Sequence, residues 1–122
     1  MANLISWFEI PVIDMERASK FYGTLLGREV QPADIMGTPY AFLPNDNEGI
    51  GGALAQGEHY QPSDRGVTIY FAMGDDLAPA LARVEPAGGK VLTPKTLIDE
   101  ENGYFAIILD TEGNRIGLHS AK

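Results

Sequence analysis

The stretch WFEIPVIDMERASKFYGTLLG, which runs from Trp7 to Gly27, decides the fold. Its apolar, aromatic start predicts a strand, and an aspartate cap, an amphipathic helix and a terminating glycine follow. When the sequence is shifted by 62 positions, IYFAMGDDLAPALARVEPAGG aligns with it, so that Asp14 matches Asp76 and Gly27 matches Gly89. Few identities survive, but the structural roles repeat, which indicates two copies of one module of about 60 residues.

Apolar runs and turn residues predict the rest of the first module. The segment 5–12 is interrupted only by Ser6 and Glu9, and we expect a strand that is buried on both faces or nearly so. A helix is expected over 14–26, because its start carries an aspartate cap and Gly27 provides its stop. Three short strands are then expected at 29–35, 38–43 and 50–56.

A polar segment at 57–66 is the predicted linker between the modules. The second module begins with a strand at 67–73 and a helix from Asp76 to Glu85, which Pro86 helps to end. Each half is therefore βαβββ, and the fold class is α+β. We expect one domain over 1–122, with the second-module strands completed at 90–98, 104–109 and 115–119 and with modules at about 3–56 and 67–120.

Composition narrows the function classes. The chain has 122 residues, 44% hydrophobic content and no cysteine, so it can form a core but neither disulfides nor thiolate metal sites. Its net charge of −8 argues against a nucleic-acid partner and permits a cationic one. The N-terminus MANLISWFEI has no signal-peptide pattern, and no apolar run is long enough to cross a membrane. A cytoplasmic protein without a membrane partner is expected.

This order of elements, with these residues, resembles the vicinal oxygen chelate superfamily, which includes glyoxalase I, extradiol dioxygenases and the fosfomycin- and bleomycin-resistance proteins. The resemblance rests on VIDMERASKFYGTLLG in the first module and GYFAIILDTEGNRIGL near the end of the chain. The second motif is similar to a family ending in which an aromatic residue precedes D-P-x-G-N-x-I-E-L. The resemblance implies two βαβββ modules that form a glyoxalase-like open curved barrel around a ligand or metal, commonly as a homodimer.

The resemblance also implies where metal ligands would stand. The first family ligand lies seven residues before the helix-capping aspartate, and Trp7 occupies that position here. Its repeat mate is Ile69, or Thr68 if the strand register differs by one. The fourth-strand ligand corresponds to about Gly52, and the final glutamate corresponds to Gly117. Because none of these side chains suits a metal site, we expect no metal and no cofactor.

Glu9 is the charged residue that the strand pattern places beside Trp7, since alternate strand residues share a face. Its carboxylate could bind a cationic ligand, act as an acid or base, or simply accept structural hydrogen bonds. Burial would favour its neutral form unless it has a partner. Gly117 and His119 share a face of the last strand, and the four residues converge if the first and last strands are neighbours.

His119 could act as a general base or a hydrogen-bond donor in that cleft, or it could merely fill space. Several strand aromatics could face the cleft and stack on a flat ligand, although the sequence does not say which of them do. These aromatics are Tyr40, Phe42, Tyr70, Phe71, Tyr104 and Phe105. The expected ligand-binding set is Trp7, Glu9, Gly52, Tyr70, Tyr104, Gly117 and His119.

Two functions follow from these observations. The first is a metal-independent protein that binds a small organic molecule of cationic or aromatic character, similar to the bleomycin-resistance branch, as a homodimer. The second is a lyase, isomerase or dioxygenase-like enzyme that uses Glu9 and His119 as acid and base or holds a relocated metal. Fold alone does not choose between them.

Overall fold

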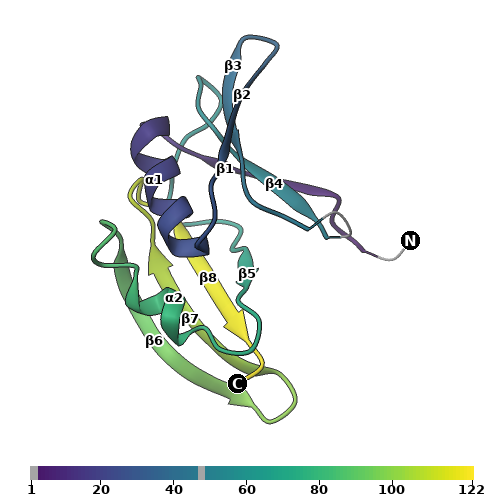
Figure 1. The fold of residues 1–122 in the computed structure, drawn as a ribbon, viewed down its shortest axis with the longest axis vertical. Coiled ribbons are helices and arrows are strands. Elements are labelled where there is room, and N and C mark those ends of the chain that lie inside the picture. The colour runs from purple at the N-terminus through teal and green to yellow at the C-terminus, as the bar shows by residue number, and fades with distance from the viewer. Residues whose placement is uncertain (1–2, 47–48) are drawn as a thin grey trace. The chain divides into compact units, whose positions relative to one another are not determined.

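The computed structural model describes residues 3–46 and 49–122. The chain divides into two compact units, residues 1–62 and 63–122 (Figure 1). Each unit contains one helix and one four-stranded sheet. The boundary falls inside the predicted linker, so residues 57–62 belong to the first unit by their contacts.

The first unit has the βαβββ order that the sequence predicts. Its sheet has the strand order β1-β4-β3-β2, in which β1 runs parallel to β4 and the other pairs are antiparallel. Pro32 lies on β2, an edge strand, where its missing N–H is tolerated. The elements are β1 (Trp7–Pro11), α1 (Met15–Leu26), β2 (Gln31–Ile35), β3 (Thr38–Phe42) and β4 (Gly51–Ala55).

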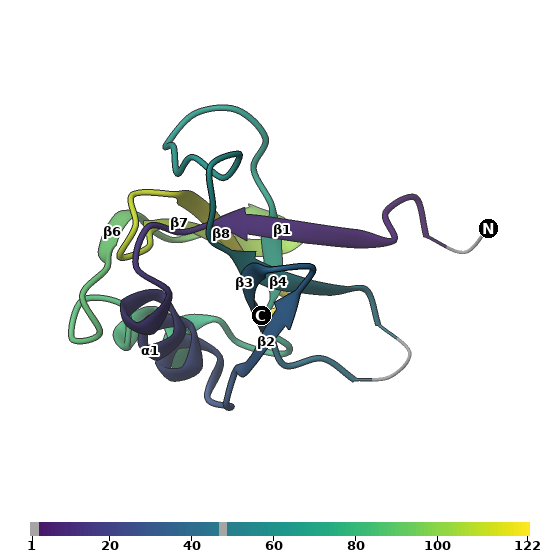
Figure 2. The same cartoon turned by 90° about the horizontal axis from the view of Figure 1, so that it is seen from above.

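Helix α1 forms as predicted because its two ends are chemically defined. The side chain of Asp14 accepts a hydrogen bond from the backbone N–H of Arg17 at 3.1 Å, which caps the first turn. Gly27 ends the helix in the left-handed conformation, with φ of 69°. Figure 2 shows α1 to one side of β2, β3 and β4, which belong to its own unit. The buried face of the helix consists of Ala18, Phe21, Tyr22 and Leu25.

Strand β1 differs from its prediction of burial on both faces. Ile10 is buried, but Glu9 is exposed and 44% of Trp7 is exposed. The reason is that successive side chains of a strand point to opposite faces and α1 packs against one face of this sheet, so Trp7 and Glu9 lie on the other face. The apolar segment that forms β1 therefore includes an exposed aromatic residue, and one face of the strand remains accessible.

The second unit repeats the first. Its sheet has the strand order β5-β8-β7-β6, with β5 parallel to β8, so each strand takes the same place as its counterpart. This agreement confirms the repeat of two βαβββ modules. The elements are β5 (Tyr70–Ala72), α2 (Ala78–Ala82), β6 (Lys90–Asp99), β7 (Gly103–Leu109) and β8 (Arg115–Ser120).

Helix α2 is shorter than the predicted segment 76–85. It ends at Ala82, and residues 83–88 continue as turns. Pro86 explains the shortening, since proline disfavours the helical conformation of the residue before it. Asp76 still serves the helix start, because its carboxylate accepts a hydrogen bond from the Ala78 N–H at 2.9 Å.

The turn between β7 and β8 is built around a buried carboxylate. Asp110 is only 4% exposed, and its Oδ1 accepts the backbone N–H groups of Glu112 and Asn114, each at 2.8 Å. Its Oδ2 accepts the side-chain amide of Asn114 at 2.9 Å. The carbonyl of that amide accepts the Ser63 N–H at 3.1 Å, so the turn also fastens the start of the second unit.

Among the described residues, no helix combines the length and the apolar character that crossing a bilayer requires.

Candidate ligand-binding site

The first sheet has one face against α1 and one face that carries the predicted site residues. Glu9 pairs with Ala53 of β4, and Ala53 pairs with Phe42 of β3. Because residues paired across strands point to the same face, Trp7 and Glu9 share theirs with Phe42 and Tyr40. Ile10, with the opposite direction, is buried on the other face. The structure therefore confirms that Trp7 and Glu9 project together.

Glu9 accepts hydrogen bonds from three aromatic side chains. The Tyr60 hydroxyl donates to Oε1 at 2.7 Å, and the Tyr40 hydroxyl donates to Oε2 at 2.9 Å. The indole Nε1–H of Trp7 also donates to Oε2, at 3.3 Å. Tyr60 comes from the segment that follows β4, which Figure 2 shows in teal on the side of β1 away from α1. The carboxylate is thus surrounded by aromatic donors.

These donors keep Glu9 ionised. The hydrogen bond from Tyr60 is the largest cause that lowers the pKa of Glu9 from its ordinary value of 4.5, with desolvation opposing it and Tyr40 and Trp7 adding to it. The bonds to Tyr40 and Glu9 in turn raise the pKa of Tyr60. From the sequence, Glu9 would be neutral if it were buried without a hydrogen-bonding or charged partner. It is exposed and partnered instead, so its charge is available to a ligand.

Trp7 contacts this carboxylate and also lines a small hollow. Its ring meets Phe42 edge to face, with centroids 6.0 Å apart. The hollow measures about 310 Å³. It is lined by Trp7, Phe42, Leu43, Asn45, Gly51 and Gly52. The exposed indole therefore offers an aromatic surface next to a negative charge.

Gly52 lines this hollow, but it does not face the Trp7 ring. A Cβ placed on Gly52 would overlap the ring of Phe8, whereas a Cβ on Gly51 would lie 3.0 Å from Cζ3 of Trp7. Gly51, which pairs with Trp7, is therefore the residue that faces it. Gly52 still lines the hollow beside Trp7, but the position opposite Trp7, expected at about Gly52, is Gly51.

A second hollow lies on the sheet of the second unit and measures about 510 Å³. It is lined by Tyr70, Ile98, Asn102, Phe105 and His119. Tyr70 and His119 thus lie together, as expected. Tyr104 does not join them: its ring lies beneath Lys95, whose Nζ is 4.7 Å from the ring centroid. Phe105 takes its place because neighbouring strand residues point to opposite faces.

Tyr70 also corrects the repeat alignment. Its ring covers Gly117, with which it pairs, so that a Cβ on Gly117 would overlap the ring. Trp7 pairs with Gly51 in the same way, and its Cζ3 lies 3.0 Å from the place that a Cβ on Gly51 would occupy. The counterpart of Trp7 is therefore Tyr70, a shift of 63 positions, and neither Ile69 nor Thr68 takes this place.

His119 has a defined orientation. Its Nε2 lies 2.6 Å from the backbone carbonyl oxygen of Asn102. Because a carbonyl oxygen can only accept, Nε2 carries the proton in this contact, and the neutral ring has its acceptor at Nδ1. His119 therefore donates a hydrogen bond to the backbone, while its expected role as a donor or base towards a ligand stays a prediction.

The first and last strands belong to different sheets, so the convergence of their four residues stays a prediction. β1 pairs with β4, while β8 lies between β5 and β7. Trp7 and Glu9 belong to the first unit, and Gly117 and His119 belong to the second. Because the four residues belong to two different sheets, each pair is considered within its own unit.

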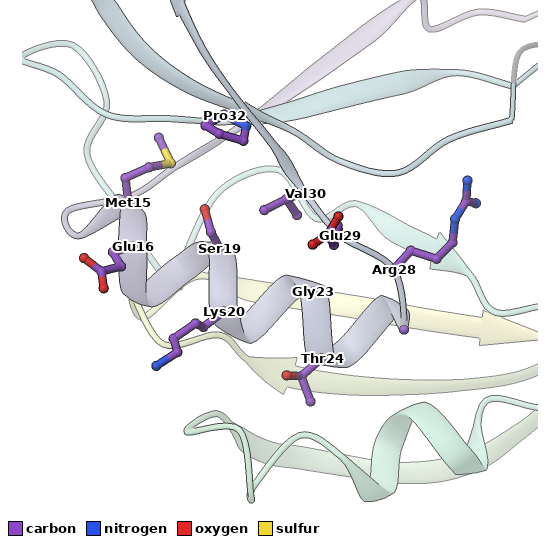
Figure 3. A pocket seen from close by; sticks show the side chains of 11 residues that line it. Met15, Glu16, Ser19, Lys20, Gly23, Thr24, Arg28, Glu29, Val30 and Pro32 are labelled. Atoms are coloured by element: carbon purple, nitrogen blue, oxygen red, sulfur yellow. The ribbon is translucent and has the colours of Figure 1, made fainter.

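A wider hollow of about 790 Å³ runs along α1 in the first unit. Figure 3 shows Met15 and Ser19 on the side of the helix that faces Val30 and Pro32, while Lys20 and Thr24 point away. Its lining combines acidic and basic residues with small ones and contains no aromatic ring. The face with Trp7 and Glu9 has less volume but more defined chemistry, and we take it as the candidate site.

The residues at the family's metal positions do not fit a metal. Trp7 and Tyr70 present aromatic rings, and Gly51 and Gly117 present no side chain. Within residues 3–46 and 49–122, no three His, Cys, Asp or Glu side chains are grouped so that they could hold an ion. A divalent metal site needs three or four convergent donors.

We accordingly predict that Zn²⁺, Ni²⁺, Mn²⁺ and Fe²⁺ do not stabilise the protein. An ion that binds only the native state, at about 100 times its Kd, would add roughly 2.7 kcal/mol to the free energy of unfolding. Thermal unfolding with each ion, repeated after addition of EDTA, measures this. An EDTA-reversible rise in melting temperature with any of the four ions contradicts the prediction.

Tyr60 is the site residue that sequence reasoning missed. It lies in the segment interpreted as a linker, outside any predicted strand, so no periodicity assigned its direction. A tyrosine among polar residues in a connection longer than most was the available signal. Tyr40 was among the strand aromatics whose face was undetermined, and the register of β3 now places it beside Glu9.

Comparisons with known proteins agree with this fold. The family model described as the Glyoxalase/Bleomycin resistance protein/Dioxygenase superfamily matches residues 4–118. A glyoxylase-like domain-containing protein from Didymella fabae is 34% identical over 117 residues, which cover 90% of this chain and 88% of that protein.

Solved structures resemble the chain over almost its whole length. A glyoxalase/bleomycin resistance protein from Albidiferax ferrireducens has a TM-score of 0.73 at 22% identity, covering 95% of this chain and 97% of that one. TnmS3, an antibiotic binding protein from a Streptomyces species, has a TM-score of 0.66 at 23% identity, covering 100% and 99%.

Proposed function

The chain belongs to the glyoxalase/bleomycin resistance protein/dioxygenase superfamily, and we propose that it is a member that binds a small organic cation without a metal. The ligand is of aromatic character and occupies the face of the first sheet that carries Trp7 and Glu9. Its ring stacks on the indole, and its positive charge lies near the carboxylate.

The ionised carboxylate among aromatic rings carries this proposal. Glu9 is exposed, its pKa is lowered, and its hydrogen-bond donors are the side chains of Trp7, Tyr40 and Tyr60. A cation over an aromatic face contributes roughly 0.5–2 kcal/mol, and the nearby negative charge adds to that attraction. The net charge of −8 favours the approach of a cation as well.

A structural neighbour gives independent support for a binding role. TnmS3, which shares the fold at 23% identity, is described as an antibiotic binding protein. This fold can therefore bind a small organic molecule. The residues that would recognise such a molecule here are this chain's own.

Three probes with the same ring test the proposal. Benzylammonium and benzyltrimethylammonium carry a positive charge at neutral pH, and benzyl alcohol does not. We expect calorimetric titration to show tighter binding of at least one cation, by about tenfold or more over the alcohol. Trp7 is the one tryptophan of the chain, so its fluorescence reports the site directly. Equal binding of all three probes, or cation binding that leaves this fluorescence unchanged, contradicts the proposal.

The enzymatic alternative has one observation in its favour. The contact with Asn102 orients the ring of His119 and assigns the proton acceptor to Nδ1, beside the hollow of the second unit. The lowered pKa of Glu9 makes that carboxyl a poor proton donor at neutral pH. A lyase or isomerase would therefore depend on His119 more than on Glu9.

A homodimer remains a prediction, and it rests on the family resemblance. We expect its interface to bury at least about 1,000 Å² in total, as specific interfaces do. Sedimentation equilibrium at micromolar concentration should give twice the chain mass of 13.2 kDa. A single species at the chain mass contradicts the prediction.

A further inference from the structure

The carboxyl of Glu9 and the hydroxyls of Tyr40 and Tyr60 form a closed ring of short contacts. Tyr60 Oη lies 2.7 Å from Oε1 of Glu9, and Tyr40 Oη lies 2.9 Å from Oε2. The two hydroxyl oxygens are themselves 2.9 Å apart. Each of these distances is within the range of a hydrogen bond, so the ring contains three such contacts.

The ring has fewer protons than contacts. Each tyrosine hydroxyl supplies one proton, and an ionised carboxylate supplies none, so two protons serve three contacts. When both hydroxyls donate to Glu9, the two tyrosine oxygens face each other without a proton between them. When Tyr40 donates to Tyr60 instead, its contact with the negative oxygen of Glu9 lacks the proton. Either arrangement leaves one contact open to an outside donor.

Solvent can fill this need in the free protein, because Glu9 is exposed and the two tyrosines are half-buried. A ligand that covers the ring displaces that solvent. It must then bring a donor of its own, since a polar group that loses its hydrogen-bond partner on binding costs free energy.

We propose that the ring formed by Glu9, Tyr40 and Tyr60 selects a protonated amine that carries at least one N–H, over a fully alkylated ammonium of the same shape. One N–H is sufficient, because one contact lacks a proton. The ammonium proton is donated to the ring, and its charge is balanced by Glu9. This inference rests on the proposed function and names the chemical class of its ligand.

A methylation series isolates the number of N–H groups. Benzylammonium has three, benzyldimethylammonium has one and benzyltrimethylammonium has none, while ring and charge are constant. We expect the first two to bind with similar affinity, and the last to bind at least about tenfold more weakly. A gradual decline with each N–H removed, or equal binding of all three, overturns the inference.

Tyr40→Phe tests the ring itself. This variant leaves one hydroxyl proton for the one remaining contact, between Tyr60 and Glu9, so we expect the step between one and no N–H to disappear. A step of unchanged size in Tyr40→Phe contradicts the inference, with circular dichroism confirming that the variant is folded.

The inference and the proposed function fail in different ways. If no cation exceeds benzyl alcohol, the proposed function is wrong, whereas cation binding without the step refutes only the role of the ring.

Discussion

Replacing Glu9 with glutamine is expected to weaken the binding of benzylammonium at least about tenfold, while benzyl alcohol is hardly affected. The substitution keeps the shape of the side chain and removes its negative charge. It also introduces an amide N–H₂ at one of the two oxygen positions, where it can donate to the hydroxyl of Tyr40 or of Tyr60, so the ring no longer lacks a proton. Calorimetric titration of both probes against both proteins measures the effect.

Asp34→Asn is the matched control. It removes one negative charge from the same unit, at an exposed carboxylate that accepts the Gly37 N–H at 2.9 Å in the β2–β3 turn. Equal losses in the two variants would mean that the net charge of the protein, and no local site, attracts the cation. The pH dependence gives a second check: because the pKa of Glu9 is lowered from its ordinary value of 4.5, the midpoint of the loss of wild-type affinity on acidification should lie below pH 4.5.

Replacing Asp110 with alanine is expected to reduce the free energy of unfolding by about 2–4 kcal/mol. Asp110 is buried, and its carboxylate accepts two backbone N–H groups and one side-chain amide N–H. Alanine leaves these donors without that acceptor in a place that water reaches poorly. Urea unfolding monitored by circular dichroism measures the loss.

Asp99→Ala provides a control of nearly identical geometry. Oδ1 of Asp99 accepts the N–H groups of Glu101 at 3.0 Å and Asn102 at 2.6 Å, and its Oδ2 accepts the Asn102 side-chain amide at 2.9 Å. This turn is exposed, so water can replace the lost acceptor and the expected effect is much smaller. If the two variants lose similar stability, burial is not what makes the turn at Asp110 important.

The parts of the fold that local chemistry determines were predictable from sequence. Asp14 and Gly27 mark the ends of α1 by capping chemistry that depends only on neighbouring residues. The repeat could be recognised because both modules have an aspartate at the helix start and a glycine after the helix. The same strand order in both sheets confirms it. The resemblance then identified the family, which the match over residues 4–118 confirms.

The faces of the strands were predicted less well, for a reason that recurs. Gly52 was expected where Gly51 faces Trp7, and Tyr104 was expected in the position that Phe105 occupies. Each difference is one residue. Strand register depends on pairing with distant strands, and an apolar run such as YFAII does not reveal which residues share the core face.

Tyr60 shows a different limit. Its hydroxyl reaches Glu9 across 51 positions of sequence, from a connecting segment without periodicity. A contact of this kind depends on the path of the chain in space. Local propensity therefore could not identify the residue that most strongly lowers the pKa of Glu9.

The rings that cover glycines also constrain how this protein can change. Tyr70 occupies the space that any side chain at Gly117 would need, and Trp7 closely approaches the corresponding space at Gly51. A carboxylate introduced at position 117 alone would collide with the phenol, and a histidine introduced at position 70 alone would face a residue that offers no second ligand. Metal chemistry is thus separated from the present sequence by coupled substitutions, each unproductive without its partner. A search for metal-dependent variants that proceeds one mutation at a time would find none at these positions. A library that randomises the aromatic residue and its paired glycine together could find them.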